Sequence, residues 1–451
     1  MNDTVAGKVD VDGFLDGLKL GRFHIVVLVL CTLLTAIDGY ELYVVGWVIP
    51  KLAKDFDVPA TAITSAMVWQ QIGMSIGAFL IPPLADRIGR TRLVVLCYTG
   101  MLITALGALN APTLDLFVVC RFFAGLFGAA MIPIAVTMAS ETAPTRLRST
   151  FATITVSGTM LGSAIGAGMQ AFVLEPYGWR GAFWIAVALP AIIVPAVWLY
   201  LPESVRSLAA RNPADPMIQV VARRMLPAGA EMPEVVAAPR PAGTATRAML
   251  RDVFGPGKTL KTLLVWGIAS CCFAYVVMSQ WKTTVYHQVM NLSWDMVASL
   301  NLVNSLAGFA GMFLIGAFID RFGFKRVLVS TYLLGMVCAV LTGWLAPSPL
   351  MLIAAGLLGL FQHGGQAGMS ALAAAIYPAS HRATGVGWAY AAGRTVAIGA
   401  PFVGSAMIAG GHSGVAIFAV LGAPLALAGL LALIVMSLPG APVITRANLR
   451  H

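Results

Sequence analysis

Four ionisable side chains lie inside long apolar stretches of this sequence, where a charge is costly. They are Asp38, Glu41, Arg121 and Arg394. A charge in an apolar medium usually marks a pathway for ions or substrates, or is paired with an opposite charge. These residue types therefore favour the binding of protons and anions.

Asp38 and Arg121 are expected to form a proton switch. Counted from opposite ends of their apolar stretches, the two residues reach a similar depth. A carboxylate within a few ångströms of an arginine stays charged until something displaces the pair. Protonation of Asp38 would then release Arg121 and shift the balance between two conformations. The alternative is a static salt bridge between two helices.

Glu41 and Arg394 add to this set. Glu41 follows Asp38 by three residues and shares its helix face, and repulsion between the two carboxylates favours proton uptake by one of them. The alternative is that Glu41 extends to the lipid headgroups. Arg394 is the preferred anchor for an organic anion, because a guanidinium donates two parallel hydrogen bonds to a carboxylate. The alternative partners of Arg394 are backbone carbonyls of its glycine-rich helix.

The elements that must position these residues are membrane-spanning helices. The chain of 451 residues is 59% hydrophobic and 11% charged, whereas soluble domains are roughly 25% charged. Runs of about 20 apolar residues, each long enough to cross a bilayer, recur along it. They cover 24–47, 62–84, 93–110, 113–138, 151–174, 182–201, 262–287, 296–318, 327–346, 349–376, 384–409 and 414–437. The sequence predicts an all-α integral membrane protein with twelve spanning helices.

The distribution of basic residues predicts the orientation. With both termini in the cytoplasm, 23 of the 29 Lys and Arg residues lie inside. Two, Arg121 and Arg394, lie within the membrane, and four are expected outside, namely Lys51, Lys54, Arg180 and Lys282. This is the positive-inside pattern of a multi-pass membrane protein. We expect its location to be a bacterial inner membrane. The net charge of +10 therefore requires no nucleic-acid partner.

The chain contains two related halves. Asp86–Arg92 and Asp320–Arg326 share the pattern D-R-x-G. The shift in numbering that takes Asp86 to Asp320, which we call the repeat offset, also takes Arg148 to Arg382. One register kept across separate loops indicates a duplication. We expect two six-helix bundles joined by a proline-rich cytoplasmic linker and flanked by cytoplasmic tails, with boundaries at 1–23, 24–201, 202–261, 262–437 and 438–451.

The repeated loops are expected to turn tightly at their glycine and to act as gates. Their acidic and basic side chains can pair across the cytoplasmic loops. The candidate gating residues are Asp86, Arg87, Arg90, Glu141, Arg148, Asp320, Arg321 and Arg382. The alternative is that the basic residues only hold the loops in the cytoplasm.

These features resemble the major facilitator superfamily. Asp38-Gly39-Tyr40-Glu41 is similar to the D-G-[FY]-[DE] signature of its aromatic acid/proton symporters, and Arg382–Trp388 is similar to their R-A-T-G-V-G-W element. The resemblance implies proton-coupled import of a benzoate- or hydroxybenzoate-like acid by alternating access. Asp38, Glu41 and Arg121 would couple protons, and Arg394 would hold the carboxylate.

Four further residues complete the candidate substrate site. His363 could donate a hydrogen bond or relay a proton, Gln366 could bind a ring hydroxyl, and Tyr40 and Trp388 could stack on an aromatic ring. The alternative for His363 and Gln366 is a contact between helices, and the alternative for the aromatic residues is the interfacial belt of the membrane. We expect no enzymatic activity, no cofactor and no metal, and a monomer as the functional unit in the bilayer. Two alternatives stay open: a proton antiporter that exports drugs or other organic ions, and a transporter-like receptor.

Overall fold

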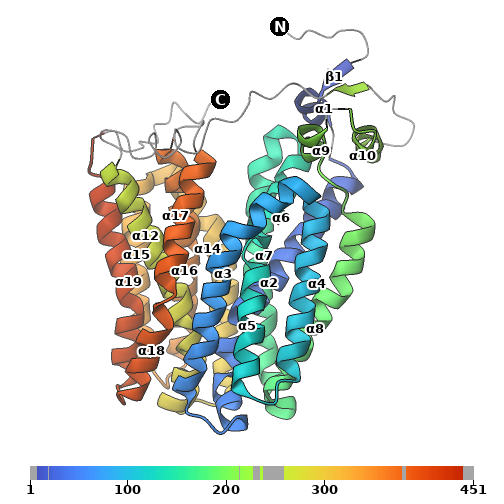
Figure 1. Cartoon of the computed structure of the whole chain (residues 1–451). Helices are drawn as coiled ribbons and strands as arrows, with labels where there is room; N and C mark the ends of the chain where they lie inside the picture. The colour runs from blue at the N-terminus through green and yellow to red at the C-terminus, as the bar shows by residue number, and fades with distance from the viewer. Residues whose placement is uncertain are drawn as a thin grey trace.

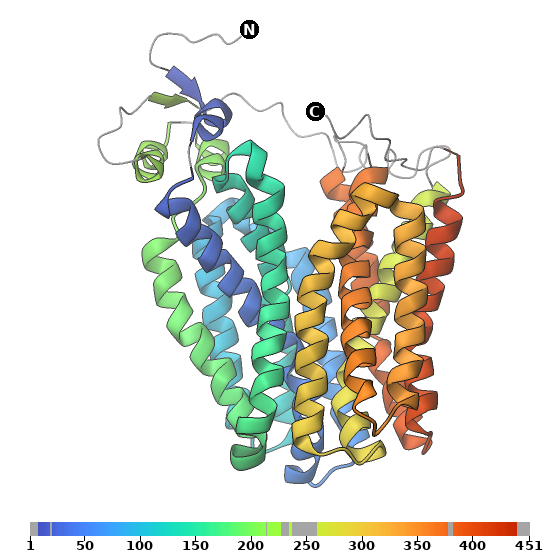
Figure 2. The ribbon, with the colours of Figure 1, turned by 180° about the vertical axis from the view of Figure 1, so that it is seen from behind.

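The structure is a computed structural model, and it describes residues 8–18, 20–212, 214–226, 234–236, 259–377 and 382–439. It is a bundle of long helices, seen from two sides in Figures 1 and 2. In this part of the chain, eleven helices or runs of consecutive helices are long and apolar enough to cross a membrane. The prediction of an all-α membrane fold is confirmed.

The first half contains six spans. Their elements are α2 (Arg22–Asp55), α3 (Thr64–Ile88), α4 (Arg90–Leu109), α5 (Leu114–Gly128) with α6 (Met131–Thr142), α7 (Arg148–Met169), and the π-helix η3 (Gln170–Leu174) with α8 (Glu175–Tyr200). Short 3₁₀ turns, η1 (Ala60–Ile63) and η2 (Thr145–Leu147), precede α3 and α7. The span that is not among the eleven is α3, whose average hydropathy is lowered by the buried Gln70 and Gln71. Its 25 residues are long enough to cross a bilayer, and α3 packs against α5 inside the bundle.

The second half repeats this order. Its elements are α12 (Thr259–Met278) continued by η4 (Ser279–Trp281), α13 (Lys282–Thr284) and η5 (Val285–Val289), then α14 (Trp294–Phe322), α15 (Phe324–Trp344), α16 (Leu350–Ile376), α17 (Arg382–Ala397) with α18 (Ala400–Ala409), and α19 (Gly414–Val435). The ends of the helices follow the repeat offset. For example, α6 ends at Thr142 and α16 at Ile376, while α7 begins at Arg148 and α17 at Arg382.

The two repeated loops turn at glycine, as predicted. Gly89 joins α3 to α4 with φ +97°, and Gly323 joins α14 to α15 with φ +82°. These positive angles favour glycine because a side chain there would clash with the backbone. Both halves therefore make the same sharp reversal.

The two halves meet along symmetry-related helices. The repeat offset relates α3 to α14 and α7 to α17, and α7 packs against α14 while α3 packs against α17. Further contacts between the halves join α2 to η4 and α13, and η1 to α18. We call the end of the bundle that carries α1, α9 and α10 the terminal end, and the opposite end the far end. The ribbons of the two halves converge toward the far end and diverge toward the terminal end (Figures 1 and 2).

A small cap lies on the first half at the terminal end (Figure 1). It contains α1 (Val11–Gly17), α9 (Val205–Arg211) and α10 (Met217–Met225), and a parallel pair of short strands, β1 (Lys8–Asp10) and β2 (Glu234–Val236). Buried apolar residues such as Leu15, Leu208 and Val221 hold the cap together. The sequence-based prediction did not include these strands.

Candidate functional site

Close helix packing fixes the direction of Asp38 and Glu41. Both lie in the middle of α2, which crosses α7 at glycines: a methyl group at Gly39 would collide with the Thr159 carbonyl, and one at Gly162 with the Ala36 carbonyl. Small residues allow such close contact between spanning helices. The acidic side chains of α2 are therefore held in defined positions inside the bundle.

Glu41, rather than Asp38, is the partner of Arg121. The Arg121 side chain is fully buried, its Nη1 donates to Glu41 Oε2 at 2.8 Å, and its Nη2 donates to the Glu41 backbone carbonyl at 3.2 Å. The guanidinium also lies over the Phe183 ring, 5.6 Å from its centroid. The expectation of an Asp38–Arg121 pair is thus wrong for this structure. Glu41 is one turn nearer the far end of α2, which brings its carboxylate to the guanidinium.

Asp38 lies instead against the C-terminal end of α5, next to the break between α5 and α6. Its side chain is 5% exposed, and its Oδ1 lies 3.1 Å from where a Cβ on Gly128 would be, at the end of α5. In the described part of the chain its carboxylate has no hydrogen-bond donor, and the cation whose charge acts on it is Arg394. Asp38 of the first half and Arg394 of the second are thus opposite charges near the same helix break, without a direct ion pair between them.

Arg394 bridges the two halves through a backbone carbonyl. Its Nη1 donates to the Ala129 carbonyl at 2.9 Å, and its guanidinium lies over the Phe273 ring at 6.0 Å from the centroid. Ala129 and Ala130 form the break between α5 and α6, so the Ala129 carbonyl is not used by a regular helix. A cation at a helix C-terminus is favoured by the helix dipole. A backbone carbonyl as partner was anticipated, but this one belongs to the other half.

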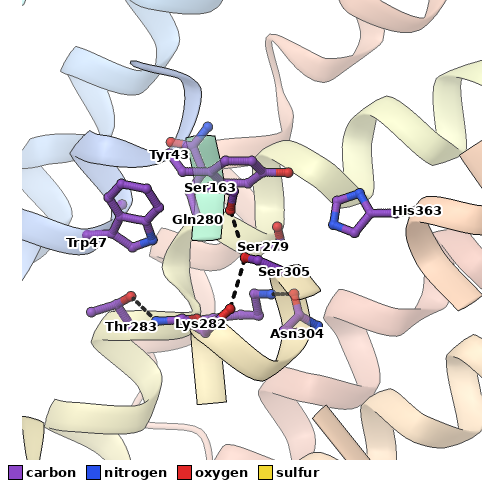
Figure 3. Close-up of a pocket in the computed structure, with 12 residues that line it drawn as sticks. Tyr43, Trp47, Ser163, Ser279, Gln280, Lys282, Thr283, Asn304, Ser305 and His363 are labelled. Carbon is purple, nitrogen blue, oxygen red and sulfur yellow. Dashed lines mark hydrogen bonds between the residues drawn. The ribbon is translucent and has the colours of Figure 1, made fainter. Parts of the chain in front are cut away.

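A buried polar pocket lies between the halves (Figure 3). We call it the Lys282 pocket. Its residues on α2, Tyr43, Gly46 and Trp47, are nearer the far end than Asp38 and Glu41. It is lined from the first half by Tyr43, Gly46, Trp47 and Ser163, and from the second by Ser279, Gln280, Lys282, Thr283, Asn301, Asn304, Ser305 and His363. Its cavity of about 20 Å³ has room for about one water molecule. An aromatic ring can enter only if the halves move apart.

The position of Lys282 differs from the one predicted from the sequence. It was expected outside the membrane, but its side chain is 8% exposed and its Nζ donates to Asn304 Oδ1 at 3.0 Å (Figure 3). The helical chain continues past Met278 through η4 and α13 to Val289, which carries Lys282 into the bundle. No carboxylate lies within ion-pair distance of Lys282 among the described residues.

Of the predicted substrate-binding residues that the structure describes, His363 alone lines this pocket. Gly308 leaves room for its ring, because a methyl group there would meet the imidazole. The Tyr40 hydroxyl donates to the Ala182 carbonyl at 2.7 Å, and Trp388 stacks on Trp266 with their ring centroids 6.1 Å apart. Gln366 is partly buried, away from the pocket.

The predicted gating residues of the first half make contacts within that half and its cap. Arg90 forms an ion pair with Glu141, which also accepts a hydrogen bond from Ser204. The carboxylate of Glu203 accepts from the backbone amide of Arg90 at 3.0 Å. Arg148 lies 3.9 Å from Asp16 of the cap.

In the second half, the repeated loop is exposed. Asp320 and Arg321 are exposed, and Arg321 lies over the Phe322 ring; Arg87 of the first half is exposed as well. The side chains of Asp86 and Arg382 lie outside the described residues. Among the side chains that the structure describes, the ordered charge cluster is therefore a feature of the first half.

Sequence reasoning missed part of the pocket. It assigned Lys282 to the outside and did not single out Gln280 or the three serines. One signal was present, because the predicted span 262–287 already contains Lys282. Among the described residues, no group of three His, Cys, Asp or Glu side chains could hold a metal ion.

Comparisons with known proteins agree with this architecture. The model of the Major Facilitator Superfamily matches residues 31–312 and 295–449. The chain is 30% identical to a gallate transporter of Pseudomonas putida, over 94% of both chains. It is 29% identical to a 4-hydroxybenzoate transporter of the same organism, over 94% of this chain and 95% of that one.

A solved structure gives the same fold. The xylose transporter of Escherichia coli, in a partially occluded inward-open conformation, matches with a TM-score of 0.67 and 15% identity, over 92% of this chain and 99% of that one. The arrangement of helices, the repeated loops and the family match lead to one conclusion. The chain belongs to the Major Facilitator Superfamily and is a membrane transporter rather than an enzyme.

Proposed function

We propose that this protein imports an aromatic carboxylate together with protons, by alternating access of its two halves. The substrate class is supported by the relatives, whose names refer to gallate and 4-hydroxybenzoate. With both termini in the cytoplasm, as the positive-inside pattern predicts, the far end faces outward. The contacts there would then close the outer side, and the central site would open to the cytoplasm.

The observation that carries the proposal is that Asp38 and Arg394, one from each half, both lie at the break between α5 and α6: the Asp38 carboxylate lies against Gly128, and Arg394 donates to the Ala129 carbonyl. Asp38 is buried without a hydrogen-bond donor among the described residues, so its charge is stabilised chiefly by Arg394. When a proton neutralises Asp38, its attraction to Arg394 is lost. The guanidinium is then available to a substrate carboxylate, which takes the place of Asp38 as its counter-charge.

In this scheme, the proton and the aromatic anion are transported in the same direction. An anion and a deprotonated Asp38 compete for Arg394, so the anion binds best after the proton has bound. Release of either solute favours release of the other, because binding free energies are linked reciprocally. Proton and anion therefore move together.

The Glu41–Arg121 pair has a different proposed role. Both charges belong to the first half and compensate each other in a buried site. Breaking such a pair leaves an uncompensated charge, which costs several kcal/mol, so the pair holds α2 against α5 during transport. The ion pair of Arg90 with Glu141 would stabilise the first half at the terminal end in the same way.

The experiment is uptake of radiolabelled 4-hydroxybenzoate into proteoliposomes, with and without an inward proton gradient. We expect gradient-driven accumulation in the wild type and its loss in Asp38→Asn, which should keep exchange of substrate across the membrane. Asp115→Asn is the matched control, since Asp115 is exposed at the start of α5. Export driven by the same gradient would point instead to an antiporter, and full accumulation by Asp38→Asn would refute the role of Asp38.

A further inference from the structure

Lys282 is a buried cation without a matching anion among the described residues. Its ammonium group has one hydrogen-bonded partner in that part of the chain, the neutral amide oxygen of Asn304. That amide is itself fixed, because Asn304 Nδ2 donates to the Ala355 carbonyl at 2.8 Å. Burial of an ammonium group is costly unless it is both hydrogen-bonded and paired with a charge. The Lys282 ammonium group has the hydrogen bond but lacks the opposite charge in the segments that the structure describes, and a bound anion would supply it.

The surroundings of Lys282 suit a planar organic anion. Tyr43 and Trp47 of α2 stack on each other with centroids 6.2 Å apart, and they form the wall that the first half contributes (Figure 3). Aromatic side chains bind an aromatic ring through stacked or edge-to-face contacts. The wall that carries the cation comes from the second half, so a ligand in the pocket would contact both halves.

The remaining lining supplies hydrogen-bonding groups that a ring hydroxyl can use. Gln280 Oε1 is buried and has no hydrogen-bond partner in the described part of the chain. The Ser163 and Ser305 hydroxyls, one from each half, lie 2.9 Å apart. A buried acceptor without a donor is unfavourable, and a phenolic hydroxyl would supply the donor.

The Lys282 pocket is separate from Arg394. Gly46, which lines the pocket, lies about two helical turns beyond Asp38 on α2, which corresponds to about 12 Å along the helix. Arg394 also already has a hydrogen-bond acceptor and a carboxylate whose charge acts on it. The two cations therefore differ both in position and in how far they are compensated.

We propose that Lys282 binds the carboxylate of a hydroxylated aromatic acid in the Lys282 pocket, with the ring against Tyr43 and Trp47. This is a second anion subsite, nearer the far end than Arg394, and it rests on the proposed function. The pocket is contracted in this structure, so the subsite fills when the halves separate at the far end. His363 lines the same pocket and supplies a further hydrogen-bonding group to the bound acid.

The test is binding of 4-hydroxybenzoate to the purified full-length protein in detergent, measured by isothermal titration calorimetry. Loss of a charge-assisted hydrogen bond predicts that Lys282→Met binds at least about tenfold more weakly. Lys282→Arg should keep part of the affinity, because it keeps the charge. Lys54→Met is the matched control, since Lys54 is exposed near the far end of α2. A thermal melt of each variant establishes that it is folded.

Two related ligands test the chemistry. Benzoate lacks the hydroxyl and should bind more weakly than 4-hydroxybenzoate, a difference that Gln280→Met should reduce. The ligand 4-hydroxybenzyl alcohol lacks the carboxylate, so its affinity should be the same for Lys282→Met as for the wild type. Equal binding of benzoate and 4-hydroxybenzoate would overturn the assignment of a hydroxylated ring.

The outcomes separate this inference from the proposed function. Binding that depends on Lys282, without proton-driven uptake in proteoliposomes, would uphold the subsite and overturn the symporter. If the wild type shows proton-driven uptake and the folded Lys282→Met variant binds 4-hydroxybenzoate as tightly as the wild type, the symporter is upheld and the subsite is overturned. Absence of binding by the wild type for both acids would overturn the subsite and the proposed substrate class together.

Discussion

Arg121 and Lys282 are both buried cations, but the protein compensates them differently. Arg121 has a carboxylate at 2.8 Å and a backbone carbonyl at 3.2 Å, both from Glu41. Lys282 has a neutral amide oxygen at 3.0 Å. Arg394 is intermediate, with a backbone carbonyl at 2.9 Å and the more distant charge of Asp38. A fully compensated cation stabilises the scaffold, whereas an incompletely compensated one is free to bind a mobile anion.

The largest expected effect is on the Arg121 pair. Arg121→Met leaves the Glu41 carboxylate buried without its cation, so the free energy of unfolding should fall by about 3–5 kcal/mol. Unfolding of the purified protein by SDS in mixed micelles measures this change. The double variant Glu41→Leu/Arg121→Met removes both charges and should be more stable than Arg121→Met alone. A single variant as stable as the wild type would contradict the scaffold role.

Arg394 should show a smaller loss. Arg394→Gln removes the charge that acts on Asp38 and weakens the hydrogen bond to the Ala129 carbonyl. A hydrogen bond to a charged group contributes about 1.5–3 kcal/mol, and the loss in the same unfolding assay should lie in that range. Arg394→Lys keeps the charge and should lose less. A loss as large as that of Arg121→Met would remove the distinction between the two arginines.

Lys282 should show the smallest change in stability. Lys282→Met removes a buried charge that has no counter-charge among the described residues and leaves Asn304 without one donor, so the two effects oppose each other. The free energy of unfolding should change by no more than about 1 kcal/mol. A loss as large as that of Arg121→Met would place Lys282 with Arg121 as part of the scaffold. The Lys282→Met variant is therefore expected to be stable but to bind the aromatic acid weakly.

The fold could be predicted well from the sequence because its strongest signals are local and repeated. Long apolar runs predict spanning helices, since every backbone group in lipid must be bonded within its own segment. The repeated D-R-x-G loops predicted the two sharp turns, which the structure places at Gly89 and Gly323. The cap was missed because β1 and β2 are very short, and because the whole first six-helix bundle separates them along the chain.

The candidate site could be predicted only in part, because partner choice depends on packing between helices. Asp38 and Glu41 share a helix face, and sequence alone could not tell which of them reaches Arg121. Lys282 was misplaced because a lysine next to Trp281 also fits the interface between membrane and water. Trp281 is instead buried, and its Nε1 donates to the Pro401 carbonyl at 3.0 Å. A contact of this kind has no signature in the local sequence.

The break between α5 and α6 has a consequence for how this transporter can evolve. The acceptor of the Arg394 hydrogen bond is the main-chain oxygen of Ala129, which every amino acid carries. Selection can thus act on this contact through the arginine or through the helix break, and hardly at all through the identity of residue 129. Neutral drift to other small residues at that position would leave the contact in place. Replacement of Pro133, which has no backbone N–H, would instead supply a competing helical donor for that carbonyl without changing either partner.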